Sequence, residues 1–215
     1  CDLADIDKWI LAKMNNFIKE SKFFYEHFEL YKLMKRSSEI LDDISNWYVR
    51  RNRRRFWKSE NDDDKLSAYH TLYTTLLNYI KIMSPVIPFI SEKIYQNIVC
   101  EISDEYPKSI HLTDFPEYNH KLDNQTIIQD IDAVKSIVNL GRSIRNKANI
   151  KIRQPLNNIK IFIKELDLSL DKYNKQILDE LNIKEIEYVT SPEEIVSYDV
   201  KLNFAMLNRD HNDSK

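Results

Sequence analysis

The sequence predicts a mainly α-helical protein, in which an antiparallel helix bundle is followed by a small α+β subdomain. Two observations predict the bundle: apolar residues recur every three or four positions before Pro155, and the 215 residues include one glycine, too few for a turn-rich β-sandwich or barrel. After Pro155 the apolar period changes to about two, which indicates strands. We therefore expect a helical domain at 1–155, an α+β subdomain at 156–207 and a tail at 208–215.

Four amphipathic helices should form the bundle, each burying one apolar stripe. The expected helices span about 5–27, 29–58 and 65–83, with a fourth from Pro88, and a fifth at 122–149 follows a connector. Asp5 and Asp7 suit the positive start of the first helix, and Pro88 suits a first helical turn because its missing N–H is not needed there. The side chains expected in the stripes include Leu41, Trp47, Leu66, Phe89 and Ile144.

The α+β subdomain should consist of a strand around 159–163, a helix over 168–181, a strand over 183–189 and a third strand over 200–206. A strand–helix–strand unit is expected to be parallel with a right-handed crossover. Gly141, the single glycine, lies on the apolar face of the preceding helix. Because glycine costs about 1 kcal/mol in a helix interior, a close helix–helix contact would explain it, and a tolerated neutral residue is the alternative.

Composition excludes several classes of function. One glycine cannot build a glycine-rich phosphate loop or a dinucleotide fingerprint, and a net charge of −2 argues against a globally basic nucleic-acid binder. The two cysteines and five histidines are scattered, so we expect no metal site, no disulfide framework and no catalytic residues. Without an apolar run of membrane length or a signal peptide, we expect a cytoplasmic protein, and a first residue other than Met indicates a piece of a longer one.

Eleven of the 32 basic side chains fall in two short segments that contain no acidic residue. The arginine cluster consists of Arg50, Arg51, Arg53, Arg54, Arg55 and Lys58. The second basic cluster consists of Arg142, Arg145, Lys147, Lys151 and Arg153. Because charge is so strongly segregated, we expect an anionic partner despite the balanced total.

Helical geometry divides the arginine cluster into two faces. At 100° per residue, Arg50, Arg53 and Trp57 fall opposite the apolar stripe, where an indole can stack on a base while the arginines take phosphates. Arg51 and Arg55 fall on the stripe itself, so either the helix outruns its core or both are buried and paired with carboxylates. A merely solvated helix end remains open for the outer arginines, and packing on the connector remains open for Trp57.

Long blocks of the sequence resemble one family in the order in which that family has them. The blocks are WYVRRNRRRFW (47–57), DKWILAKMN (7–15), MSPVIPFISEKIYQNI (83–98), LGRSIRNKANIKIRQPL (140–156) and ELNIKEIEYV (180–189). They are similar to the anticodon-binding domain of isoleucyl-tRNA synthetases, class I enzymes, in the eukaryote-like form that some bacteria also have. Valyl, leucyl and methionyl synthetases share the helical bundle but not this arginine run.

The resemblance implies a monomer that binds tRNA(Ile) and positions it for upstream catalytic and editing domains, with ATP and Mg²⁺ used by the parent enzyme and no cofactor here. Its class I His-x-Gly-His motif cannot be written with Gly141 alone, and a Lys-Met-Ser-Lys-Ser loop is absent. The residues expected to contact tRNA are Arg50, Arg53, Arg54, Trp57, Arg142, Arg145, Lys147, Lys151 and Arg153. Arg51, Arg55, Trp47 and Gly141 stay ambiguous or structural. The alternatives are a sister synthetase, or a scaffold whose arginines meet an acidic protein.

Overall fold

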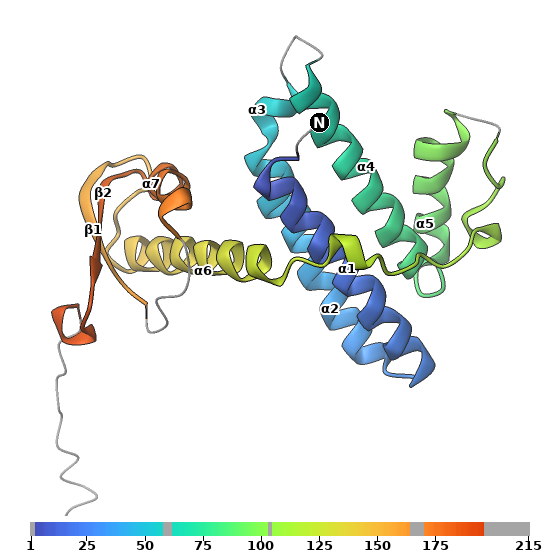
Figure 1. The fold of residues 1–215 in the computed structure, drawn as a ribbon, viewed down its shortest axis with the longest axis horizontal. Helices are drawn as coiled ribbons and strands as arrows, with labels where there is room; N and C mark the ends of the chain where they lie inside the picture. Colours follow the sequence, from blue (N-terminus) through green and yellow to red (C-terminus); the bar gives the residue numbers. More distant parts are fainter. Residues whose placement is uncertain (1–2, 58–61, 103–104, 164–169, 196–215) are drawn as a thin grey trace, which may run out of the picture. The chain divides into compact units, whose positions relative to one another are not determined.

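The computed structural model describes residues 3–57, 62–102, 105–163 and 170–195, and the strand expected at 200–206 lies outside them. The chain divides into two compact units, Cys1–Ala133 and Val134–Lys215. The domain boundary expected at residue 155 stays a prediction. The described part is mainly helical with one small sheet, which confirms the predicted fold class (Figure 1). No described helix combines the length and the apolar character that crossing a membrane requires.

The first unit is a bundle in which successive long helices reverse direction (Figure 1). Its helices are α1 (Asp5–Glu26), α2 (Leu30–Asp42), α3 (Arg53–Phe56), α4 (Asp63–Met83) and α5 (Pro88–Tyr95), and α6 (Gln125–Lys147) begins in it. Short 3₁₀ turns at Ile110–Leu112 and His120–Leu122 follow α5. Helix α1 packs on both α2 and α4, and its Trp9 and Phe17 are fully buried. Pro88 is in the first turn of α5, as predicted.

The helix expected at 29–58 is not continuous. Helix α2 passes into a π-helical turn, Asp43–Val49, and α3 is a separate single turn. Asn52, which lies between the two, is buried, and its side-chain nitrogen donates to the Tyr48 carbonyl oxygen at 2.9 Å. A second π-helical turn, Gln96–Cys100, extends α5. Apolar periodicity could not reveal either turn, because α and π turns share one continuous apolar face.

The second unit contains two parallel strands, β1 (Leu156–Phe162) and β2 (Ile183–Val189), in which Ile159 lies opposite Ile186. Between them lie a 3₁₀ turn, Leu170–Tyr173, and helix α7 (Asn174–Leu181), and a last 3₁₀ turn spans Pro192–Glu194. A Cβ atom added to Gly141 would lie 2.6 Å from Leu181 Cδ1. Gly141 therefore does permit close approach of α6 and α7.

Several side chains expected in the core are exposed instead, among them Leu41, Leu66, Phe89 and Ile144. Their exposed fractions are 47% for Leu41, 57% for Leu66, 90% for Phe89 and 64% for Ile144. Each lies on an apolar stripe that is wider than the surface its neighbouring helices cover in the described part of the chain. Trp47, at 4% exposed, is buried as expected.

Candidate nucleic-acid interface

The arginine-rich turn is held to the bundle by the two residues in it that carry no charge. Asn52 is buried between the π-helical turn and α3. Phe56 is 8% exposed, and its ring packs edge-on against Tyr48 and Tyr69 at centroid distances of 6.3 and 5.2 Å. Because these two side chains face inward, the remaining positions of the single-turn helix α3 are left to arginines.

The outer face of this turn consists of Arg50, Arg53, Arg54 and Trp57, all of them exposed. The Trp57 side chain is 72% exposed, so packing on the connector is excluded. The Arg53 guanidinium carbon lies 4.6 Å from the Trp57 ring centroid, a cation–π contact. Arg50 Nε donates to the Asn46 carbonyl oxygen at 2.9 Å. The outer face thus combines an accessible aromatic surface with three guanidinium groups.

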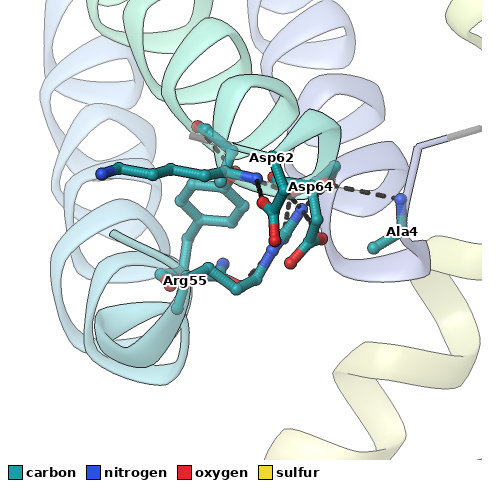
Figure 2. Close-up of polar contacts among 9 residues, drawn as sticks. Ala4, Arg55, Asp62 and Asp64 are labelled. Carbon is teal, nitrogen blue, oxygen red and sulfur yellow. Dashed lines mark hydrogen bonds and ion pairs between the residues drawn. The ribbon is translucent and has the colours of Figure 1, made fainter. Parts of the chain in front are cut away.

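Arg55 faces the other way, and for this arginine the buried, paired alternative is correct. Its side chain is 14% exposed and forms an ion pair of 2.8 Å with Asp7. A second ion pair of 2.8 Å joins it to Asp64 (Figure 2). Burial works to lower the pKa of Arg55, but the hydrogen bonds and charges of Asp7 and Asp64 outweigh burial and raise it above its ordinary value. Arg55 therefore stays charged and is committed to the protein interior.

Arg51 covers the buried indole of the π-helical turn. Its guanidinium carbon lies 4.9 Å from the Trp47 ring centroid. Arg51 is half-buried and Trp47 is buried, so this pair is part of the packing beneath the outer face. Lys58 lies outside the described residues.

The second basic cluster loses a member to the interior. Arg145 is 4% exposed, and its guanidinium donates to the carbonyl oxygens of Lys151 at 3.2 Å, Gln154 at 3.0 Å and Asn182 at 3.1 Å. These bonds tie the turn after α6 to the segment that enters β2. The expectation that Arg145 contacts tRNA is therefore corrected: it rested on the segregation of charge along the sequence, which does not show that the chain folds back over this side chain.

Arg142 is also engaged within the second unit, because its Nη2 forms an ion pair with Glu180 Oε2 on α7. Lys147, Lys151 and Arg153 are exposed. The cluster thus keeps three accessible cations, with one partly buried arginine beside them.

Sequence reasoning missed the groups that hold the arginine-rich turn in place. Asp7 was expected to act only on the helix dipole, yet its side chain is fully buried beneath Tyr48 and Arg55. A second buried group, Lys13, pairs with Asp43 at 3.2 Å and Asp132 at 2.9 Å. No local pattern joins such distant residues, and the one available signal was the position of Arg55 on the apolar stripe.

The first unit also contains a groove of about 860 Å³ at the end of α1. Its lining is largely apolar and aromatic and includes Phe23, Phe115 and Tyr118. Among the described residues, no group of three or more His, Cys, Asp or Glu side chains is placed to hold a metal ion. The exposed cations and the exposed indole described above suit binding through charge and stacking.

Residues 7–162 match the protein family described as the anticodon-binding domain of tRNA ligase. The chain is 40% identical over 204 residues to an isoleucine–tRNA ligase of Clostridium novyi, covering 95% of this chain and 19% of that protein. It is 39% identical over 207 residues to an isoleucine–tRNA ligase of Treponema denticola, covering 95% of this chain and 18% of that protein. The chain thus spans about a fifth of the length of these curated relatives.

Proposed function

The chain belongs to the family of anticodon-binding domains of tRNA ligases, and we propose that it docks the anticodon stem and loop of tRNA(Ile) for an isoleucine–tRNA ligase. The observation that carries the proposal is the outer face, where the Arg53 guanidinium stacks on a Trp57 indole that is 72% exposed. Aromatic side chains beside arginines bind unstacked bases and phosphates together. The identity with isoleucine–tRNA ligases supports the choice of amino acid.

In this proposal the chain contributes positioning and no bond chemistry. Upstream domains of the parent ligase would form the aminoacyl-adenylate from ATP with Mg²⁺ and would edit mischarged tRNA. With one glycine, the sequence cannot contain a glycine-rich phosphate-binding loop. We further propose a monomeric, cytoplasmic parent of the eukaryote-like form, which the sequence blocks quoted above favour.

The first prediction concerns the salt dependence of binding to an anticodon-arm RNA hairpin. We expect replacement of Arg50 and Arg53 by Gln to weaken binding and to make the log–log salt slope shallower by roughly 1.5, because each neutralised phosphate contributes about 0.7–0.9. The measurement is fluorescence anisotropy of a labelled tRNA(Ile) hairpin between low and moderate salt.

The matched control removes the same number of positive charges elsewhere. Lys35 on α2 and Lys175 on α7 are both exposed, so Lys35→Gln with Lys175→Gln changes net charge equally and should leave the slope unchanged. Equal slope changes in both double variants would show that the chain responds only to total charge, against an RNA site at the outer face. In the full-length ligase, Arg50→Gln with Arg53→Gln should raise KM for tRNA and leave tRNA-independent adenylate formation intact.

Two alternatives predict different outcomes. If the arginines instead meet an acidic protein, excess tRNA will displace nothing from that complex. If the parent is a sister synthetase, charging assays will show valine, leucine or methionine transferred in place of isoleucine. These assays need the full-length protein, because we do not assign an amino-acid pocket to the residues of this chain.

A further inference from the structure

The turn that carries the outer face is anchored to a fully buried carboxylate at the start of α1. Asp7 Oδ1 and Oδ2 accept hydrogen bonds from Arg55 Nη1 and Nη2, each at 2.8 Å. The Tyr48 hydroxyl donates to Asp7 Oδ1 at 2.7 Å, and the backbone N–H of Ala4 donates to Oδ2 at 3.2 Å. Both oxygens of the buried Asp7 carboxylate are thus held by geometrically specific partners.

The same guanidinium also reaches the start of α4 (Figure 2). Arg55 Nη2 lies 2.8 Å from Asp64 Oδ1 and donates to the Asp64 carbonyl oxygen at 3.1 Å. One hydroxyl supplements this link, because Tyr69 on α4 donates to the Phe56 carbonyl oxygen at 3.2 Å. Arg55 therefore joins three elements, namely α1, α3 and α4, through one planar group.

Helix α3 has no means of fixing its own position. It has four residues, and so short a helix is not stable by itself in water. Arg53, Arg54 and Arg55 occupy this one turn, and Trp57 directly follows it. The direction in which the outer face points therefore depends on contacts with the bundle, and Arg55 adds directional contacts to the packing of Asn52 and Phe56.

Stability alone is a weak explanation for such a buried ion pair. Replacing a buried ion pair by well-packed apolar residues is often neutral or stabilising, because the desolvation of both charges offsets their attraction. A bidentate pair does, however, restrict the orientation of the guanidinium far more than apolar packing does. The contacts of Arg55 are thus better suited to fixing the geometry of α3.

We propose that Asp7, Tyr48 and Arg55 form a positioning clamp that presents Arg53, Arg54 and Trp57 to RNA without contacting the RNA. The inference rests on the proposed RNA-binding function and adds the residues that preorganise it. When the clamp is loosened, only part of the population presents the outer face correctly, so apparent affinity falls in proportion to that part. Clamp residues are positioning residues, distinct from the outer face that makes the contacts.

The decisive comparison is Arg55→Lys against Arg54→Lys in this chain, measured with the tRNA(Ile) hairpin. Both substitutions preserve the charge, but an ammonium cannot make the two parallel bonds to Asp7. We expect Arg55→Lys to weaken binding roughly fivefold or more with an unchanged salt slope, because no phosphate contact is lost. Arg54→Lys should stay within about twofold of the wild type, since a phosphate accepts either cation.

Two variants that each remove one uncharged hydroxyl group separate a positioning role from simple loss of stability. Tyr48→Phe removes the hydroxyl on Asp7, and Tyr79→Phe removes a buried hydroxyl that bonds to Ser37 Oγ at 2.8 Å. Both should lower Tm by comparable amounts. Only Tyr48→Phe should weaken RNA binding, at temperatures where both variants are fully folded. Equal effects of Tyr48→Phe and Tyr79→Phe on RNA binding, or full affinity in Arg55→Lys, would overturn the clamp.

How rigidly the outer face is held can also be measured without RNA, by ¹⁹F NMR of Trp57. With 5-fluorotryptophan incorporated, Trp57 is assigned by the ¹⁹F resonance that Trp57→Phe removes. In Tyr48→Phe and Arg55→Lys this resonance should sharpen and move toward the position of free tryptophan, while Tyr79→Phe leaves it in place. An unmoved Trp57 resonance in both clamp variants contradicts the inference. Absence of RNA binding by the wild-type chain contradicts the proposed function, and the ¹⁹F result still tests the clamp.

Discussion

At the scale of single residues, Trp57 is the most informative side chain on the surface. Its indole is 72% exposed even though the Arg53 guanidinium stacks on it. An exposed tryptophan costs solvation free energy that folding does not recover. A function in binding accounts for keeping an indole at this position.

We predict that Trp57→Ala weakens binding of the anticodon-arm hairpin by about 1–3 kcal/mol, because one base loses its stacking partner. The Tm should change little, since the side chain contributes little to the core. Trp57→Phe should restore part of the affinity by offering a smaller aromatic face. Isothermal titration calorimetry should show the highest affinity for the wild type, a lower one for Trp57→Phe and the lowest for Trp57→Ala. Equal affinities of the three proteins would remove Trp57 from the interface.

At the scale of secondary-structure elements, the contact between α6 and α7 depends on the missing side chain of Gly141. Leu181 at the end of α7 is fully buried, and its Cδ1 and Cδ2 atoms would lie 2.6 and 2.8 Å from a Cβ at position 141. Two opposing effects therefore meet at this position. Alanine favours the helix by about 1 kcal/mol, and overpacking a filled site costs typically 1–3 kcal/mol.

A double-mutant cycle should reveal these two effects, because the change in the free energy of unfolding caused by Gly141→Ala should reverse its sign when Leu181 is replaced. We expect Gly141→Ala to lower the free energy of unfolding by about 1 kcal/mol in the wild-type background, because overpacking exceeds the gain in helix propensity. In the Leu181→Ala background the obstacle is gone, so Gly141→Ala should raise the free energy of unfolding by a similar amount. Urea unfolding measures all four proteins, and the same sign in both backgrounds would refute the close contact.

Elements were predictable from the sequence where the information is local. The apolar stripes predicted α1 and α4 to within a few residues, and Pro88 marked the start of α5. The π-helical turn at Asp43–Val49 was not predictable, since it keeps the apolar face continuous. The widths of the buried stripes were not predictable either, because burial depends on how far neighbouring helices reach.

The candidate site was also predictable only where the information is local. Counting 100° per residue placed Arg53 and Trp57 together on an outer face, and it placed Arg55 on the inner one. The partners of Arg55 were not predictable, because Asp7 is 48 positions away in the chain. The burial of Arg145 depends on a chain reversal that brings three carbonyl oxygens to its guanidinium. Charge patterns thus locate a surface, and tertiary contacts decide which of its members are accessible.

At the scale of the whole molecule, stability in alkali should depend on a half-buried phenol that joins α1 to the end of α4. The Tyr25 hydroxyl donates to the Ile82 carbonyl oxygen at 2.8 Å, and burial raises the pKa of Tyr25 from 10.0 to about 12. Above pH 10 the unfolded chain loses this proton while the folded chain keeps it, so deprotonation favours unfolding. Burial also raises the pKa of Tyr48, with a contribution of the same sign from the Asp7 hydrogen bond.

We therefore predict that the free energy of unfolding falls as pH rises from 10 toward 12. In Tyr25→Phe the free energy of unfolding should fall less steeply over this interval. Urea titrations at several pH values give both curves, and the difference between them isolates Tyr25 from the other titrating groups. Parallel curves would show that the Tyr25 phenol titrates alike in both states.

The π-helical turn has a consequence for how this protein tolerates change in length. A π turn holds one more residue than the α turn it replaces, so deleting one residue within Asp43–Val49 would relax it to an ordinary helix. The residues after the deletion would keep their orientation, because the π turn completes with one extra residue the same rotation that an α turn completes without it. Deleting one residue from the regular turns of α2 would instead rotate everything after it by about 100°, and the guanidinium now buried against α1 would swing toward solvent. Lineages that keep the surface should therefore tolerate the loss of one residue within Asp43–Val49 better than the loss of one residue within α2.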